Sequence, residues 1–307
     1  MTRLRADLLL LTAALIWGTA FVAQQVGNGF VSPSMFIAGR FVMSALLLAP
    51  FAVREARGAA KMRPRDLALA IAIGVTLFAG ATAQQVGLKM TTVTNAGFIT
   101  SLYIAFVPFV GWAIVRTAVR PLVLVAVVVS LAGAWLLTDN GVTALSKGDF
   151  LVAGSALLFA LHIVLIGAFQ KSAHRPFFLS FAQYAVVALI AGAIGFGTEP
   201  VDWTAMRAAL PSIAYAGILS GGVGYTLQIV AQRYTPATEA ALIMSLESMF
   251  AAIAAAILLG ERLTLLGAVG CGLILLGVVM VEIVPLLPRR NGERTDDLPP
   301  IGTVPLD

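Results

Sequence analysis

The chain has 307 residues, of which 59% are hydrophobic and 11% are charged, and its mean hydropathy is +0.94. Soluble domains carry about 25% charged residues, so this composition excludes a soluble protein and predicts one that is solvated mainly by lipid. The formal net charge of +5 does not indicate a nucleic-acid-binding protein, because the basic residues are spread over short loops. The single cysteine, Cys271, excludes a disulfide within the chain.

Ten apolar stretches are each long enough to form a transmembrane helix, which needs about 20 residues. In chain order they are residues 7–27, 33–53, 66–88, 94–115, 119–138, 149–170, 176–196, 210–232, 237–259 and 262–284. The sequence therefore predicts an all-α integral membrane protein with ten transmembrane helices. Residues 285–307 are rich in proline and charge, and we expect them to form a disordered cytoplasmic tail.

The lysines and arginines predict how these spans are oriented in the membrane. With the N-terminus in the cytoplasm, fifteen of the twenty basic residues fall on the cytoplasmic side, four fall outside and Arg40 lies within a span. Cytoplasmic loops of membrane proteins carry such an excess of basic residues. We therefore predict a multi-pass protein of a bacterial-type inner membrane with both termini in the cytoplasm.

The two halves of the chain resemble each other. At a shift of 144 residues, the matched positions are Thr94 and Thr238, Ala96 and Ala240, Ser101 and Ser245, and Leu102 and Leu246. Pairs with similar shifts include Trp17 with Phe159 and Pro33 with Pro176. Each unit contains five spans, an odd number, so the second unit must enter the membrane from the opposite side. We predict two inverted five-helix repeats, residues 1–138 and 149–284, around a central cavity.

Several motifs within this frame resemble the EamA branch of the drug/metabolite transporter superfamily. They are LIWGTAF at 15–21, GRF at 39–41, SLES at 245–248, LLGERLT at 258–264 and GCGLILLGVV at 270–279. The resemblance covers residues 7–284 and implies ten helices, cytoplasmic termini, a central cavity and export of small metabolites. Within that branch the chain is most similar to bacterial exporters of aromatic and other amino acids. It has Ser248 where the family often has proline.

Two ionisable residues inside the spans, Arg40 and Glu247, are the leading candidates for function. A charge in the bilayer interior costs about 3 to over 10 kcal/mol, so it usually faces the bundle interior or water. In the functional interpretation, Glu247 lines the cavity and meets a substrate amine or a proton. In the structural alternative, Arg40 and Glu247 form an intramembrane pair, or Arg40 extends to the outer surface.

Polar and aromatic residues at helical spacing are predicted to line the substrate cavity. They are Trp17, Phe21, Gln84, Ser101, Tyr103, His162, Tyr225, Gln228, Ser245 and Glu247. For each of them the alternative role is packing or hydrogen bonding between helices. Pro108, Gly221 and Gly222 are candidates for a kink or a moving gate.

These features favour export or facilitated transport of small metabolites, above all amino acids, by alternating access. The alternative is a membrane-embedded enzyme or a receptor without transport activity. The sequence contains no HExxH motif, cysteine pair or nucleotide-binding loop, so we predict no catalytic residues, no metal and no cofactor. The expected partners are a small-molecule substrate and the lipid bilayer, not nucleic acid.

Overall fold

The computed structural model describes residues 1–57, 59–116, 119–136, 146–262 and 264–282, and every regular element in these ranges is helical. The elements are α1 (Arg3–Gly27), α2 (Pro33–Ala56), α3 (Pro64–Leu88), α4 (Val93–Ser101), α5 (Tyr103–Val115), α6 (Pro121–Leu136), α7 (Lys147–Ser172), α8 (Pro176–Thr198), α9 (Trp203–Ala214), the π-helix η2 (Tyr215–Tyr225), α10 (Thr226–Ala231), α11 (Ala237–Met244), α12 (Leu246–Leu258) and α13 (Leu265–Glu282). The predicted tail, 285–307, lies outside the described residues.

The helices follow the ten predicted spans, and the all-helical fold is confirmed. Eight of the resulting segments are long and apolar enough to cross a membrane, judged by length and composition. The other two helices, α6 and α13, have 16 and 18 described residues, or about 24 and 27 Å at 1.5 Å per residue. Three segments contain more than one element, because α4 with α5, α9 with η2 and α10, and α11 with α12 each form one span.

The predicted start of the eighth span at residue 210 is wrong. The helix begins at Trp203, where the Asp202 side chain accepts hydrogen bonds from the backbone N–H groups of Thr204 and Ala205 at 2.8 and 3.1 Å. An aspartate at this position satisfies N–H groups that have no partner inside the helix. Arg207 therefore lies within the first turns of a helix and not in a loop as we expected from the sequence.

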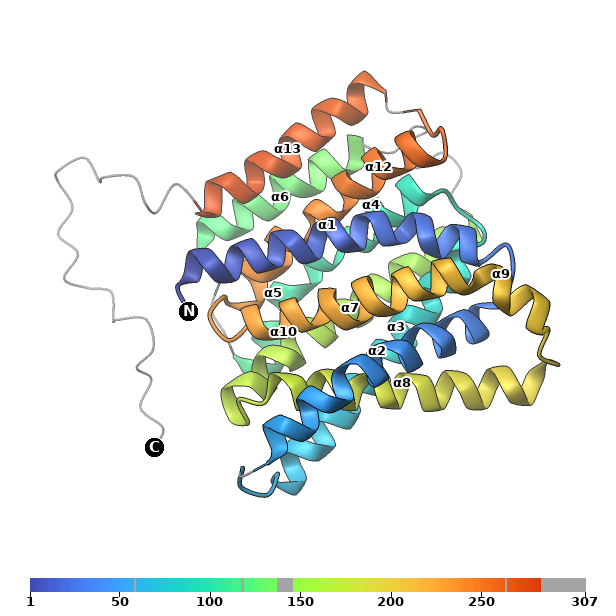
Figure 1. Ribbon diagram of the computed structural model, residues 1–307. Coiled ribbons are helices and arrows are strands. Elements are labelled where there is room, and N and C mark those ends of the chain that lie inside the picture. Colours follow the sequence, from blue (N-terminus) through green and yellow to red (C-terminus); the bar gives the residue numbers. More distant parts are fainter. Residues whose placement is uncertain (58, 117–118, 137–145, 263, 283–307) are drawn as a thin grey trace, which may run out of the picture.

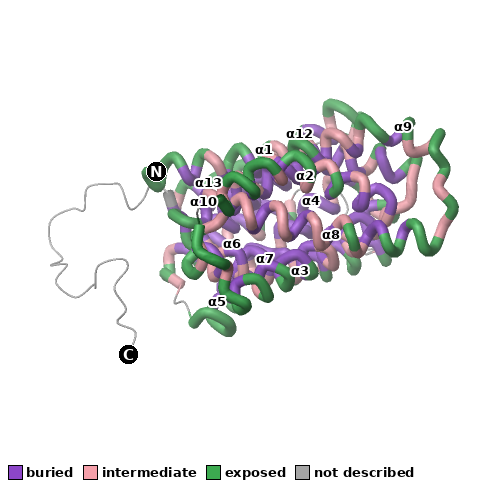
Figure 2. Tube along the Cα trace, turned by 60° about the horizontal axis from the view of Figure 1, so that its bottom comes forward, coloured by how far each residue is buried: buried purple, intermediate pink, exposed green. Residues whose placement is uncertain are grey.

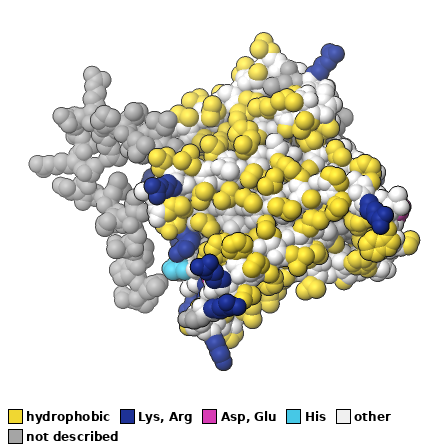
Figure 3. Space-filling view, in the orientation of Figure 1, with side chains coloured by type: hydrophobic (Ala, Val, Ile, Leu, Met, Phe, Trp, Pro, Cys, Tyr) yellow, Lys and Arg dark blue, Asp and Glu magenta, His cyan; other side chains and the backbone are white. Residues whose placement is uncertain are grey.

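Hydrophobic side chains cover the outside of the helix bundle. Leu46, Leu189 and Ile257 are 70%, 73% and 76% exposed, and Figure 2 shows buried residues concentrated inside the bundle. On the face shown in Figure 3, hydrophobic side chains occupy the middle and the visible lysines and arginines lie toward the edges. An exposed apolar surface of this extent is typical of a bundle surrounded by lipid.

The packing of the helices repeats when the two halves are exchanged. The exchange relates α1 to α7, α2 to α8, α6 to α13, α4–α5 to α11–α12, and α3 to α9–η2–α10. Accordingly, the packing of α1 on α12 is equivalent to that of α7 on α5. The packing of α3 on α7 is likewise equivalent to that of η2 on α1. The pairs α2–α8 and α6–α13 each join equivalent helices of the two halves, and α6 and α13 lie side by side in Figure 1.

Polar contacts between the halves follow the same symmetry. Thr235 donates to Asp7 at 2.8 Å, and its counterpart Thr91 donates to Asp149 at 2.7 Å. Each of these threonines precedes a broken helix of one half, and each aspartate belongs to the first helix of the other half. The two contacts thus join the halves through equivalent positions of the repeat.

The helices α2 and α8 are joined at both ends by a second symmetric pair of contacts. Glu55, near the end of α2, accepts from the backbone N–H of Phe178 at 2.7 Å in the first turn of α8. Glu199, 144 residues later and just after α8, accepts from the hydroxyl of Ser32, the N-cap of α2. Acidic groups at helix N-termini are stabilising. Glu55 caps α8 directly, whereas Glu199 holds the Ser32 side chain that caps α2.

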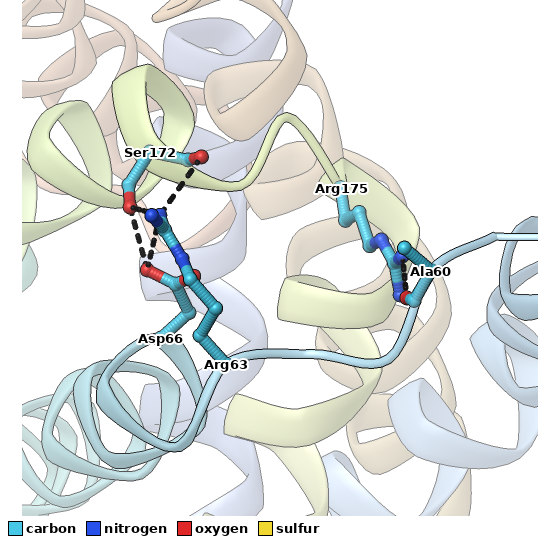
Figure 4. A network of polar contacts seen from close by, with 5 residues as sticks. All are labelled: Ala60, Arg63, Asp66, Ser172 and Arg175. Carbon is cyan, nitrogen blue, oxygen red and sulfur yellow. Dashed lines mark hydrogen bonds and ion pairs between the residues drawn. The ribbon is translucent and has the colours of Figure 1, made fainter.

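A polar network connects the segment before α3 with the end of α7 (Figure 4). Arg63 donates to Asp66 at 2.7 Å and to the Ser172 hydroxyl at 2.6 Å, and Ser172 donates to Asp66 at 2.5 Å. Nearby, Arg175 donates to the Ala60 carbonyl. The connections α2–α3 and α7–α8 therefore lie at the same end of the bundle, as an even number of intervening spans requires.

Both termini are expected to lie in the cytoplasm, because basic residues concentrate at the connections on that side of the bundle. Fusing a reporter that is active only in the cytoplasm to each end of the full chain should give a signal from both fusions. A reporter that is active only in the periplasm should stay silent in both. A periplasmic signal from either terminus would contradict the predicted orientation.

Candidate functional site

Two broken helices meet at the centre of the bundle. The fourth span is interrupted at Leu102, between α4 and α5, and the ninth at Ser245, between α11 and α12. Ser101 donates to the carbonyl of its own residue i−4, Gly97, at 3.0 Å, and Ser245 donates to Leu242 at 2.7 Å. Serine hydroxyls that bond back to their own helix favour bends. A proline at position 248 is therefore not needed for the ninth span to break.

The two breaks touch each other across the interface between the halves. The Ser101 hydroxyl reaches the Ser245 carbonyl at 3.5 Å, and these serines are equivalent positions of the repeat. Tyr103 and Glu247 lie two residues after Ser101 and Ser245, and both line a central cavity. The breaks thus bring an equivalent pair of side chains to the middle of the protein.

The cavity lies between the halves, and nearly all of its walls are buried. Its lining consists of Trp17, Phe21, Gln24, Arg40, Gln84, Thr100, Tyr103, Phe159, His162, Ile163, Ser220, Tyr225, Gln228, Met244 and Glu247. The space open to the centres of water molecules is about 40 Å³. One water needs roughly 10–15 Å³ of such space, so this conformation has room for a few waters and not for a metabolite.

The lining is built from equivalent positions of the two repeats. Five pairs on the cavity wall are related by a shift of 142 or 144 residues: Trp17 and Phe159, Phe21 and Ile163, Gln84 and Gln228, Thr100 and Met244, and Tyr103 and Glu247. The side chains differ in four of these pairs, and only Gln84 and Gln228 are identical. This asymmetry makes the two sides of the cavity chemically distinct.

Arg40 is a cavity residue, and the predicted Arg40–Glu247 ion pair is absent from the described part of the chain. The guanidinium donates to Gln24 Oε1 at 3.1 Å and to Ser220 Oγ at 2.9 Å, and it lies 5.0 Å from the centre of the Phe41 ring. No carboxylate of the described residues lies within 4.0 Å of it. The side chain is 4% exposed, so the expectation that it extends to the outer surface is wrong as well.

The π-helix η2 shapes the wall next to Arg40. Its carbonyl groups accept side-chain donors from three other helices, since Ser44 donates to Gly217 at 2.7 Å, Trp17 to Ser220 at 3.1 Å and Tyr184 to Gly221 at 2.8 Å. Segments of π-helix occur frequently at functional sites. Ser220 was not predicted as a cavity residue, because a π-helix changes which residues share a face and the glycines around it indicate only close packing.

Glu247 lies beside Tyr103 and interacts with its hydroxyl electrostatically. Even so, Glu247 Oε1 and the Tyr103 hydroxyl are both buried without a hydrogen-bond partner of normal geometry among the described residues. Gln228 Oε1 is in the same situation. Buried polar atoms without partners are costly and are usually satisfied by water or a ligand. The cavity therefore presents several acceptors and donors to whatever occupies it.

Of the other predicted cavity residues, some lie on the cavity wall and some do not. Trp17 packs on Tyr225 with ring centres 4.8 Å apart, and His162 meets the same ring edge-on at 5.7 Å. The His162 Nε2 atom is 2.9 Å from Gln183 Oε1, so a structural partner accounts for it. Ser101 and Ser245 are at the helix breaks and not among the cavity-lining side chains described above.

The three residues expected at a kink or gate differ in their surroundings. Helix α5 continues through Pro108, and the interruption of the fourth span lies at Leu102 instead. Gly221 and Gly222 belong to η2, where the packing against α2 is close. A Cβ at position 221 would lie 2.1 Å from Ser44 Oγ.

Comparison with known proteins identifies the family to which the chain belongs. The model of the EamA-like transporter family matches the chain twice, over residues 4–139 and 146–283. The chain belongs to this family. The double match agrees with a duplicated unit, and it makes this protein a membrane transporter and not an enzyme.

Relatives of this EamA-like transporter are described only in general terms. It is 32% identical over 283 residues to an uncharacterized transporter of Archaeoglobus fulgidus, covering 92% of this chain and 87% of that protein. It is 25% identical over 289 residues to the uncharacterized transporter YwfM of Bacillus subtilis, covering 91% and 94%. A crystal structure with 17% identity has the same fold, with a TM-score of 0.74 over 91% of this chain and 96% of that one.

Proposed function

We propose that this EamA-like transporter exports amino acids from the cytoplasm by alternating access through the cavity between its two halves. The observation that carries the proposal is the Glu247 carboxylate, which has no ion-pair partner among the described residues and lies on the wall of a buried cavity with five aromatic side chains. Residues 1–138 and 149–284 are the two units that would move relative to each other. Pro108, Gly221 and Gly222 remain candidates for the moving parts.

Alternating access is supported by the symmetric contacts between the halves. The Asp7–Thr235 and Asp149–Thr91 hydrogen bonds join equivalent positions, and inversion of the repeat places them toward opposite ends of the bundle. The cavity is too small for a metabolite in this conformation, so the helices must separate at one end to admit one. Opening at one end would break one of the two Asp–Thr hydrogen bonds. Opening at the other end would break the equivalent hydrogen bond of the repeat.

The chemistry of the walls favours an amino acid as the substrate. A buried charge is stable only when it is paired or solvated. A substrate ammonium group would supply the positive partner for the Glu247 carboxylate. The aromatic rings of Trp17, Phe21 and Tyr225 offer a surface for an apolar side chain and for a cation. The combination of one carboxylate with aromatic walls fits a molecule that has both an ammonium group and a side chain.

Transport by the purified protein in liposomes tests this proposal. We expect uptake of labelled leucine, phenylalanine or threonine above the level of protein-free liposomes, and faster uptake when the liposomes are preloaded with the same unlabelled amino acid. Repeating the assay with an imposed pH gradient separates proton-coupled from facilitated transport. Export further requires that cells producing the protein retain less of a loaded amino acid than control cells. No uptake of any of the three would contradict the proposal.

A further inference from the structure

The cavity carries a second unpaired charge, the guanidinium of Arg40. A guanidinium has five N–H donors in a planar fork. In this protein two of its nitrogens donate to neutral oxygens, those of Gln24 and Ser220. The Nε atom is buried without a partner among the described residues. The positive charge is thus held in a fixed position and is not neutralised by any described carboxylate.

The position of Arg40 is set by the fold rather than by its charge. A Cβ on Gly217 would lie 2.6 Å from the Arg40 carbonyl oxygen, so only glycine lets α2 and η2 approach this closely. Ser44, one turn along α2, donates to the carbonyls of Arg40 and Gly217 and joins the same two helices. Burying a cation here costs free energy, and nothing in this packing requires the residue to be charged.

Arg40, Glu247 and Tyr225 line the same cavity. The guanidinium and the carboxylate are not within 4.0 Å of each other. The cavity therefore presents a cation and an anion that are separated and both incompletely satisfied. A zwitterion has the complementary arrangement of charges.

We infer that Arg40 binds the carboxylate of the substrate while Glu247 binds its ammonium group, so that the transported class is zwitterionic amino acids and not simple amines. Arginine binds carboxylates through paired N–H donors, which fixes orientation as well as charge. The inference rests on the proposed function and extends it, since a substrate amine alone would leave Arg40 unpaired.

The test compares amino acids with their carboxamides in the reconstituted protein. Leucinamide, phenylalaninamide and threoninamide keep the ammonium group and the side chain and lose the carboxylate. As unlabelled competitors of the parent amino acid in the wild-type protein, we expect them to be about ten- to a hundredfold weaker, as for loss of a hydrogen bond between charged groups. Competition as strong as that of the parent amino acid would overturn the inference.

Variants at position 40 give the second part of the test. In Arg40→Gln we expect flux of the amino acid to fall by a similar factor and the amide to compete as well as the amino acid. Arg40→Lys keeps the charge but not the paired donors, so we expect it to keep part of the preference. Ser130→Ala changes a buried serine of α6 that lies outside the cavity, and it should leave the preference unchanged.

The outcomes separate the two proposals. If the wild-type protein moves none of the amino acids, the proposed function fails. If it moves them but accepts the amides equally, and Arg40→Gln leaves the preference unchanged, only the role of Arg40 is overturned. If Arg40→Gln does not fold, the role of Arg40 is still tested by the competition of amides with amino acids in the wild-type protein and in Arg40→Lys. A thermal-shift measurement gives a readout independent of flux, because the amino acid should raise the melting temperature of the wild-type protein and the amide should not.

Discussion

Replacing Glu247 by glutamine is expected to lower amino-acid flux by about tenfold or more, the effect of losing a hydrogen-bonded charge, while the protein still folds and inserts. Glutamine keeps the size of the side chain and removes the charge that would bind the ammonium group. Because the carboxylate has no ion-pair partner within 4.0 Å among the described residues, its removal should leave the melting temperature unchanged or higher. Flux in liposomes and thermal unfolding in detergent measure the two effects.

Glu239→Gln is the matched control for this prediction. Glu239 lies in the same span but outside the cavity, and it forms an ion pair with Arg3 at 2.5 Å. Its replacement should lower the melting temperature and leave flux per folded protein largely unchanged, the opposite pattern to Glu247→Gln. Unchanged flux in a stable Glu247→Gln protein would remove that charge from the mechanism. An unstable Glu247→Gln protein rescued by Arg40→Gln would restore the structural pair as the explanation.

Replacing Gly18 by alanine is expected to destabilise the protein by about 2 kcal/mol, in the range for overpacking a tight interface. At this position α1 crosses α12, and a Cβ would lie 2.7 Å from the Glu247 carbonyl oxygen and 2.8 Å from the Ala251 nitrogen. These are backbone atoms and cannot rotate away, so the two helices must separate. A lower melting temperature of the purified protein is the expected result.

Gly154→Ala provides the comparison for Gly18→Ala. Gly154 lies within α7, and a Cβ there would meet no other atom within 4 Å. The change should be neutral or stabilising by about 0.5–1 kcal/mol, because alanine loses less backbone freedom than glycine in a helix. If both variants melt at the wild-type temperature, then α1 and α12 are not packed as closely as described here.

Local composition was sufficient to predict the spans, because a lipid-facing helix must be apolar over most of its length. The boundaries of the first three predicted spans agree with α1, α2 and α3 to within a few residues. The eighth span was predicted less well, since Arg207 lies in its first turns and lowered the apolar signal there. The π-helix η2 and the break at Ser245 also went unpredicted, because both depend on side chains that compete for backbone groups.

The repeat predicts further cavity-lining residues, which are the equivalents of those identified in the other half. Phe159 was matched with Trp17 on sequence, and Ile163 and Met244 occupy the positions equivalent to Phe21 and Thr100. Applying the shift to the candidates Trp17 and Phe21 identifies Phe159 and Ile163 as lining residues, whereas Met244 corresponds to Thr100, which was not a candidate. Apolar side chains such as these give no signal of their own in a sequence that is 59% hydrophobic.

The sequence by itself determined the membrane fold, the duplication and the presence of two costly charges inside the spans, because these follow from composition and from positions along the chain. The partners of those charges were decided only by the tertiary structure. Arg40 and Glu247 lie in different halves, and whether they pair depends on the angle and distance at which α2 and α12 are held. The close approach of α2 to η2 turns Arg40 toward Gln24 and Ser220, and this packing leaves the two charges apart on one cavity.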